Sequence, residues 1–94
     1  MEIKKYYIEY ATAVIGNDIP VLPNIWREKI KSAIEEKLVS NPEVFGKPLR
    51  RSLKGFRSLR VGDYRVIYLI KRDVVIIVII KHRSVTYKEI MKRI

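Results

Sequence analysis

The chain has 94 residues, of which 48% are hydrophobic, and its 20 Lys and Arg against 10 Asp and Glu give a formal net charge of +10. This length predicts a single domain over residues 1–94, with one hydrophobic core. Without cysteine and with one histidine, the chain can form neither a disulfide nor a cysteine-based zinc site, so we expect no metal and no other cofactor.

The apolar segments of the chain are short. The longest, residues 74–80, has seven residues and falls well below the length of a membrane span. The charged amino terminus is not followed by the apolar stretch of a signal peptide. We therefore expect a soluble, cytoplasmic protein.

The first half of the chain predicts one strand and two helices. A loose alternation of apolar residues over 3–10 is typical of a strand that adds to the sheet. Residues 11–19 predict only a short or broken helix, because a glycine and a nearby proline oppose a longer one. Residues 24–39 place apolar side chains at three- and four-residue spacing, which predicts an amphipathic helix with Asn24 as its N-cap.

The second half predicts an antiparallel meander. Three runs rich in apolar and β-branched residues, 57–61, 64–70 and 74–80, are separated by the Gly62-Asp63 pair and by the basic break 71–73. Gly62 at the first central position of a two-residue loop fits a type II′ hairpin turn. Because the third run is apolar at every position, both of its faces should be covered.

Shorter segments flank the meander. Residues 49–53 predict a short edge strand or an irregular run, and Ser84 or Thr86 is expected to cap a last short helix. The elements together predict an α+β fold. Its antiparallel, mixed-edge sheet should have about four strands, with the N-terminal helices packed on one face and a short C-terminal helix.

The register of the first hairpin brings two arginines together. A two-residue turn places Leu59 opposite Val66 and Arg60 opposite Arg65. Like charges that face each other across a sheet are destabilising, so a facing arginine pair indicates an anionic partner. If residues 72 and 73 alone form the second turn, His82 lies on the same face as these arginines, whereas a longer turn reverses this parity.

The excess positive charge is confined to the second half of the chain. Residues 1–46 carry six Lys and Arg and seven Asp and Glu, whereas residues 47–94 carry fourteen and three. Six basic residues and no acid lie between Lys47 and Gly62, which is typical of a surface that binds a polyanion. A solvated basic rim is the alternative, and the facing arginines favour nucleic acid.

Two blocks of sequence resemble the RelE/ParE superfamily of type II toxins. The first is LRVGDYRVIY at residues 59–68, and the second is HRxxxY at residues 82–87 after the last strand. Both occur at the spacing and in the element order of that family, over nearly the whole chain. The resemblance implies a RelE-like fold and a small basic ribonuclease that enters the ribosomal A site and cleaves messenger RNA. It also implies a RelB-like antitoxin that wraps the toxin, for which the basic half predicts an acidic and apolar segment.

The resemblance also implies roles for individual residues. The catalytic residues would be Arg65, Arg83, His82 and Tyr87. Basic residues in and around the first hairpin, which the charge pattern predicts to contact RNA, are Lys47, Arg50, Arg51, Lys54, Arg57, Arg60 and Lys81. Arginines suit this site because a planar guanidinium binds two phosphate oxygens at once.

The general base is left open. In the best-known RelE branch, lysines in the strand before the turn help catalysis, but Phe56 and Ser58 stand at those positions here. His82 carries the side-chain type that exchanges protons near neutral pH, although a single histidine at a strand end is often structural. Tyr87 could transfer a proton, stack on a base, or simply pack the last helix.

Two other functions fit the same fold. ParE relatives inhibit DNA gyrase by binding and need no ribonuclease residues, and the absent lysines are compatible with an RNA-binding module that has lost catalysis. Arginines at positions 65 and 83 with a terminal Tyr87 favour the RelE-like ribonuclease.

Overall fold

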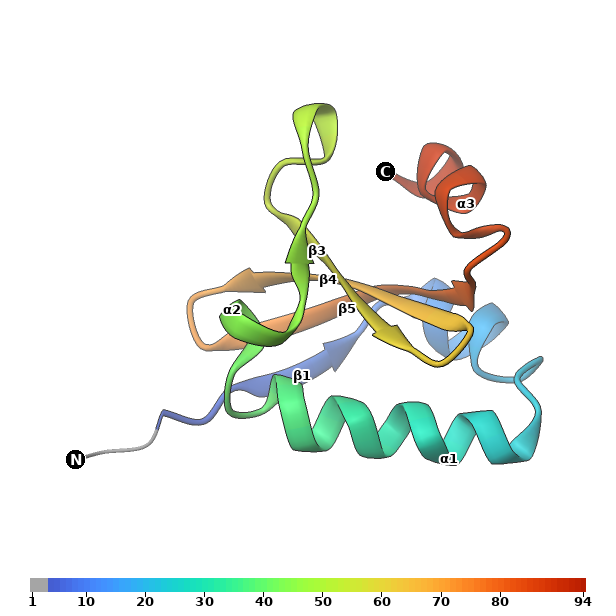
Figure 1. The fold of residues 1–94 in the computed structure, drawn as a ribbon, viewed down its shortest axis with the longest axis horizontal. Helices are drawn as coiled ribbons and strands as arrows, with labels where there is room; N and C mark the ends of the chain where they lie inside the picture. The colour runs from blue at the N-terminus through green and yellow to red at the C-terminus, as the bar shows by residue number, and fades with distance from the viewer. Residues whose placement is uncertain (1–3) are drawn as a thin grey trace.

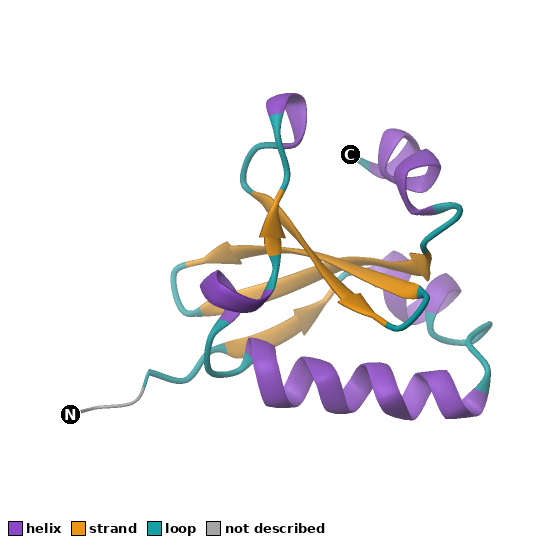
Figure 2. Cartoon of the chain, viewed as in Figure 1, coloured by secondary structure: helices purple, strands orange, loops and turns teal. Residues whose placement is uncertain are grey.

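A computed structural model describes residues 4–94 and builds them around one five-stranded sheet (Figures 1 and 2). The strands are β1 (Tyr7–Tyr10), β2 (Lys47–Pro48), β3 (Phe56–Val61), β4 (Tyr64–Lys71) and β5 (Val74–His82). Their order across the sheet is β1-β5-β4-β3-β2, with β1 parallel to β5 and the other pairs antiparallel. The α+β class is confirmed. The sheet has five strands because Lys47–Pro48 adds a short edge strand ahead of residues 49–53, the segment predicted to be a strand or irregular.

The β3–β4 hairpin follows the predicted register, with Leu59 opposite Val66 and Arg60 opposite Arg65. Gly62 has a φ of +59°, and Asp63 is not among the described residues with positive φ, which is the type II′ pattern. A Cβ at Gly62 would lie 2.3 Å from the Trp26 ring, so glycine is required there by both conformation and packing.

A β-bulge changes the register of the β4–β5 hairpin. Its turn has the predicted two residues, 72 and 73, but Ile67 pairs with Ile79 and Tyr68 with Ile77, which leaves Val78 as an extra residue. The side chains beyond the bulge therefore exchange faces. Arg65 lies opposite Lys81 and Tyr64 opposite His82, so the prediction that a two-residue turn would place His82 on the arginine face is wrong.

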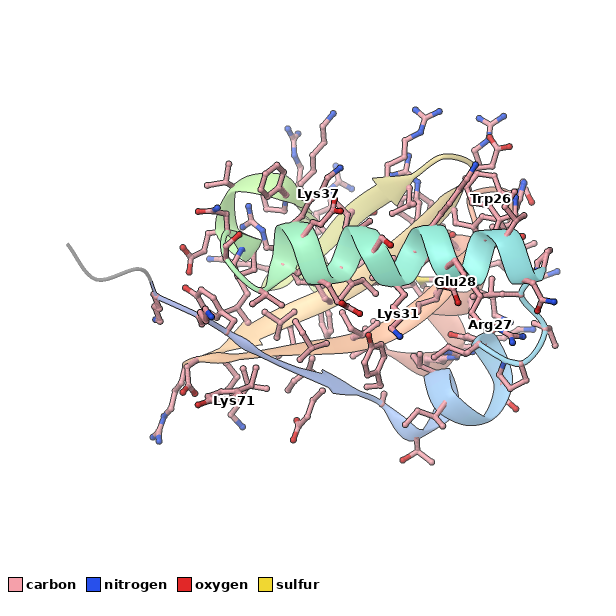
Figure 3. The ribbon with its side chains drawn as sticks, turned by 90° about the horizontal axis from the view of Figure 1, so that it is seen from below. Trp26, Arg27, Glu28, Lys31, Lys37 and Lys71 are labelled. Atoms are coloured by element: carbon pink, nitrogen blue, oxygen red, sulfur yellow. The ribbon has the colours of Figure 1, made fainter. Side chains whose placement is uncertain are left out.

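The face of the sheet that carries Leu59, Val66 and Tyr68, here called the covered face, packs against helices from the first half of the chain. These are η1 (Val14–Asp18), α1 (Asn24–Ala33) and its continuation η2 (Ile34–Leu38). Figure 3 shows α1 running along this face. The predicted short N-terminal helix and long amphipathic helix are both found. The N-cap of α1 is Pro23, because Asn24 already lies inside the helix and no side chain caps it.

The opposite face, here called the open face, carries Ser58, Arg60 and Arg65 and is covered only in part. α3 (Thr86–Arg93) lies over this face (Figure 1), and its Ile90 packs against Ile67 and Ile79. α2 (Pro42–Phe45) and η3 (Arg51–Leu53) flank β2. Because α3 is short, alternate residues of β5 such as Ile76 stay partly exposed, so the prediction that both faces of this strand are covered holds for only part of its length.

Two predicted details at the chain ends differ or go untested. Neither Ser84 nor Thr86 caps α3: the N-cap is Val85, and the buried Thr86 hydroxyl donates to the carbonyl of His82. The predicted first strand begins at residue 3, which lies outside the described residues, and is observed from Tyr7. Within residues 4–94, none of the helices has the length and apolar character needed to cross a membrane.

Candidate nucleic-acid interface

Two arginines form the centre of the open face. Arg60 and Arg65 are cross-strand neighbours on β3 and β4, as the sequence predicts. The Arg65 guanidinium donates one bond of 3.3 Å to the buried Ser58 hydroxyl, and Arg60 donates from Nε to the carbonyl of Gly62 at 3.1 Å. Within residues 4–94, no carboxylate forms an ion pair with either arginine. Two neighbouring positive charges without an acid make a strong anion site.

A cavity of about 690 Å³ lies over this pair, between the β2 segment, the β3–β4 hairpin and α3. This volume is within the range of small-ligand sites. The lining side chains are Lys37, Phe45, Lys47, Pro48, Leu49, Arg50, Leu53, Ser58, Leu59, Arg60, Arg65 and Tyr87. The cavity thus combines cations with apolar and aromatic walls, the combination that binds both the phosphates and the bases of single-stranded RNA.

The cavity brings together five of the residues predicted from the sequence. They are Lys47, Arg50, Arg60, Arg65 and Tyr87. Tyr87 lies in the first turn of α3 and is 55% exposed, so its ring is available to a ligand. These five come from β2, the loop after it, the hairpin and the last helix, which shows that the fold gathers residues from both predicted blocks at one site.

His82 does not join this site. Its ring contacts Tyr64 edge-on, with ring centroids 5.5 Å apart, and Tyr64 in turn packs on Trp26 at 5.1 Å. The backbone N–H of Ser84 donates to Nδ1 of His82 at 3.2 Å, which places the ring proton of the neutral form on Nε2. The bulge at Val78 explains the position, because it puts His82 on the same face as Tyr64.

Lys81 lies opposite Arg65 in the β4–β5 pairing, and Arg83 follows the end of β5. The side chains of both residues bind acids. The ammonium of Lys81 is 3.3 Å from a carboxylate oxygen of Asp18, and the Arg83 guanidinium is 3.7 Å from that of Asp63. The Arg83–Asp63 pair is exposed, so it is weak and leaves Arg83 free to rotate. Neither side chain lines the cavity in this conformation.

Three of the predicted RNA-contacting residues also lie outside the cavity. Arg57 is on the covered-face side of β3 and donates to the carbonyls of Glu43 and Gly46 at 2.5 and 2.7 Å, so it joins α2 to the sheet. Arg51 and Lys54 are exposed in the loop between β2 and β3. Exposed cations there can still contribute to non-specific attraction of a polyanion.

Sequence reasoning missed several residues of this region. Four side chains that the sequence analysis does not assign to a site line the cavity: Lys37, Phe45, Leu49 and Leu53. The spacing of these residues in the sequence does not predict their place at the cavity, because that place depends on how the β2 segment packs against the rest of the fold. The sequence also predicts no role for Asp18, which lies between Asn17 and Ile19.

Asp18 is fully buried and binds three partners. It accepts from the Ile80 backbone N–H at 2.9 Å, from the Arg93 guanidinium at 2.5 and 2.8 Å, and pairs with Lys81. Burial raises the pKa of the Asp18 carboxyl. The hydrogen bonds from Arg93 and Ile80 and the charges of Arg93 and Lys81 outweigh burial and hold the pKa below its ordinary value. The carboxylate is therefore the stable form.

Comparison with known proteins identifies the family. The family model for the ParE toxin of the type II toxin-antitoxin system matches residues 3–87. The chain belongs to the RelE/ParE superfamily of type II toxins. It is 42% identical over 83 residues to a Toxin RelE from Mycobacterium tuberculosis, an alignment that covers 82% of this chain and 81% of the relative.

Solved structures of this superfamily share the fold of the toxin. The toxin–antitoxin complex RelBE2 from Mycobacterium tuberculosis aligns with a TM-score of 0.80 at 30% identity, over 88% of this chain and 97% of that one. The RelB–RelE complex from Methanococcus jannaschii aligns at 0.68 and 24% identity, over 86% and 96%. The isolated RelE toxin of E. coli aligns at 0.68 and 21% identity, over 94% and 97%. The predicted family and the predicted RelE-like fold are both confirmed.

Proposed function

We propose that this toxin is an endoribonuclease that enters the ribosomal A site, cleaves messenger RNA and thereby stops translation. The observation that carries the proposal is the facing pair Arg60 and Arg65 at a cavity of about 690 Å³ that Tyr87 also lines. A site of positive charge with an aromatic wall suits an RNA phosphate and its base. Because ribosomes translate in the cytoplasm, we place the toxin there.

The reaction requires no metal in this proposal. The 2′-oxygen attacks the neighbouring phosphorus and loses its proton to a base, the phosphorus–O5′ bond breaks, and O5′ receives a proton from an acid. Arg60 and Arg65 stabilise the negative charge that builds on the phosphate oxygens. Arg83 contacts the same phosphate if RNA binding breaks its ion pair with Asp63, which is weak because it is exposed.

Tyr87 is the side chain to which we assign either a proton transfer or stacking on a base. Its ring belongs to the cavity, whereas His82 packs against Tyr64 on the covered-face side. Two variants separate the two roles. Tyr87→Phe keeps the stacking ring and removes the hydroxyl, so it retains activity if Tyr87 stacks and loses it, as Tyr87→Ala does, if Tyr87 transfers a proton.

We infer that an antitoxin with acidic and apolar side chains covers the open face. Two of the related structures are complexes of RelE-type toxins with RelB antitoxins. In this chain, apolar residues in and directly after α3 remain exposed, with Met91 at 78% and Ile94 at 46%. Ile94 lines a cavity of about 390 Å³ together with Phe56, Leu69 and Val78. Co-purification with an acidic product of a neighbouring gene tests this inference.

A second candidate function is inhibition of DNA gyrase by binding. It is favoured by one observation, that the matching family model describes the ParE toxin. A supercoiling assay with purified toxin separates the two candidates, because the ribonuclease should leave gyrase unaffected. A toxin that binds ribosomes without cutting messages would instead be an RNA-binding module without catalysis.

The deciding experiment is controlled expression in growing cells, with mapping of message 5′ ends. We expect growth arrest with cuts inside translated messages, lost in Arg65→Ala and Arg83→Ala. Lys71→Ala is the matched control, because Lys71 is exposed at the far end of β4 from Arg65 (Figure 3). Arrest without cuts would move the assignment to gyrase, and cuts that persist in Arg65→Ala would overturn the proposed site.

A further inference from the structure

Asp18 occupies the place at the edge of β5 where strand pairing stops. β1 pairs with β5 only from Tyr7 to Tyr10, and the last backbone bond in this line joins Ala11 N–H to the Ile77 carbonyl. Further along β5, the Ile80 N–H has no strand beside it and donates to the Asp18 carboxylate instead. η1 therefore substitutes one buried side chain for a continued strand, which satisfies a backbone group that would otherwise be buried without a partner.

The same carboxylate holds the end of α3. Both terminal nitrogens of Arg93 donate to Asp18, one to each carboxylate oxygen, in a two-bond fork. Arg93 also donates to the carbonyl of Val78, the extra residue of the bulge, at 3.2 Å, and to Glu89 at 3.0 Å. The last turn of α3 is thus bound to η1 and to the irregular point of β5.

α3 depends on such anchors because it has eight residues and no side-chain N-cap. A helix this short is unstable in isolation. Its first turn is held by Thr86, whose hydroxyl donates to the His82 carbonyl at 2.8 Å, and its middle by Ile90 on the sheet. Tyr87 follows Thr86 directly, so the orientation of α3 decides where the Tyr87 ring meets the cavity.

We propose that Asp18 is a positioning residue for this cavity: by holding Arg93 it fixes the orientation of α3 and so the place of Tyr87 beside the arginine pair. Asp18 itself does not line the cavity and touches no RNA in this arrangement. The inference rests on the proposed ribonuclease function, since the role it assigns to Asp18 is exerted through Tyr87.

Two variants disrupt the contact between Asp18 and Arg93, one at each residue. Asp18→Asn removes the charge, and Arg93→Met removes the fork while Asp18 keeps Lys81 and the Ile80 N–H. Glu89→Gln is the matched control, because Glu89 also binds Arg93 but only within α3. If Asp18 only completed the edge of β5, Arg93→Met would behave like the wild type. Arg93→Met also keeps the proposal testable if Asp18→Asn fails to fold.

The measurement combines amide hydrogen exchange with cleavage kinetics on programmed ribosomes. In Arg93→Met we expect faster exchange confined to residues 86–93 and a fall in kcat/KM of roughly 10- to 100-fold, the size expected when a group that contacts the substrate is displaced. In a Tyr87→Ala background, Arg93→Met should cause no further loss, because both changes remove the same group from the site. Glu89→Gln should match the wild type in both readouts.

The outcomes are distinguishable from those of the proposed function. Unchanged exchange over residues 86–93 in Arg93→Met overturns the positioning role, whether or not the toxin cleaves RNA. Normal cleavage by Arg93→Met, or an equal further loss in the Tyr87→Ala background, overturns it as well while the ribonuclease function stands. A wild-type toxin that cleaves nothing overturns the proposed function, and the exchange measurement then still decides whether Asp18 holds α3 through Arg93.

Discussion

Arg57 and Arg65 lie on the same hairpin but on opposite faces of the sheet, and their surroundings differ completely. Arg57 donates to two backbone carbonyls of the segment that contains α2, at 2.5 and 2.7 Å. Arg65 donates to one hydroxyl at 3.3 Å and faces Arg60 across the strands. Because side chains alternate along a strand, one short segment supplies both a structural cation and a cation of the proposed RNA site. Charge alone therefore does not separate the two kinds of cation in this toxin, whereas the face of the sheet does.

The largest expected effect concerns Asp18, which joins the layers on the two faces. η1 packs into the core under the covered face, whereas Arg93 belongs to the helix on the open face. Asp18→Asn leaves Arg93 and Lys81 beside a neutral amide, and removing one partner of a buried ion pair costs about 3–5 kcal/mol of unfolding free energy. Urea denaturation measures this loss, and Glu89→Gln, which breaks a pair within α3 alone, should lose far less.

The acid dependence of stability sharpens the same prediction. The pKa of the Asp18 carboxyl is lowered in the folded toxin, so the unfolded chain binds this proton at a higher pH than the folded one. The contribution of Asp18 to stability is therefore fully present above the unfolded pKa and is lost as the pH falls through the folded value. Thermal denaturation between neutral and strongly acidic pH should show a steeper decline for the wild type than for Asp18→Asn. Equal slopes would contradict this explanation.

On the open face, Arg65→Ala should remove function and leave the fold intact. We expect the cleavage rate to fall roughly 100-fold or more, the typical cost of one lost group that stabilises transition-state charge. The stability should change by only about 1 kcal/mol, because the fold loses a single hydrogen bond, the 3.3 Å bond from Arg65 to the Ser58 hydroxyl. Rates on programmed ribosomes and a melting temperature, measured beside Lys71→Ala, check both halves. A large drop in melting temperature would show that Arg65 also stabilises the fold and would contradict this prediction.

On the covered face, Arg57→Ala should do the reverse. Two carbonyls lose a charged donor, and hydrogen bonds to charged groups contribute about 1.5–3 kcal/mol of stability. RNA cleavage per folded molecule should remain near that of the wild type, because Arg57 does not line the cavity. Denaturant titration measures the loss of stability, and cleavage rates corrected for the fraction of active protein measure the effect on cleavage. A cleavage defect as large as that of Arg65→Ala would place Arg57 among the binding residues after all.

The smallest effect is expected for His82→Gln. The ring is exposed and contacts Tyr64 and Ser84, away from the cavity. The cleavage rate should stay within about 2-fold of the wild type, the range of an ordinary surface substitution. A bell-shaped pH–rate profile that loses one limb in His82→Gln would instead assign His82 a catalytic proton transfer.

Local pattern predicts most of this fold. The amphipathic helix, the three strands of the meander and the register that pairs Arg60 with Arg65 follow from periodicity and from one turn, because each depends on neighbours in sequence. The same local logic finds Arg60 and Arg65, whereas Tyr87 is expected only from the family resemblance of the HRxxxY block. It does not find Lys37 or Phe45, whose place at the cavity depends on where the β2 segment packs.

The errors also have physical causes. Arg57 reads as one more cation of a basic run, since a sequence does not show carbonyls that are donated by a distant turn. Asn24 reads as a helix N-cap because its side chain suits that position, but the backbone begins the helix one residue earlier. Counting residues from a two-residue turn predicts His82 on the arginine face, and the count fails where a strand contains an extra residue.

Because Val78 is an extra residue in β5, it changes the face of the sheet on which each following residue of the HR block lies. Of the adjacent residues 81 and 82, only one can lie on the face of the arginine pair. The extra residue places Lys81 there, where Asp18 binds it. A relative with the same letters in this block but an unbroken strand would present its histidine toward the arginines. Matching the motif letter by letter therefore does not transfer the chemistry, and strand length upstream must be compared before a histidine in this block is assigned to catalysis.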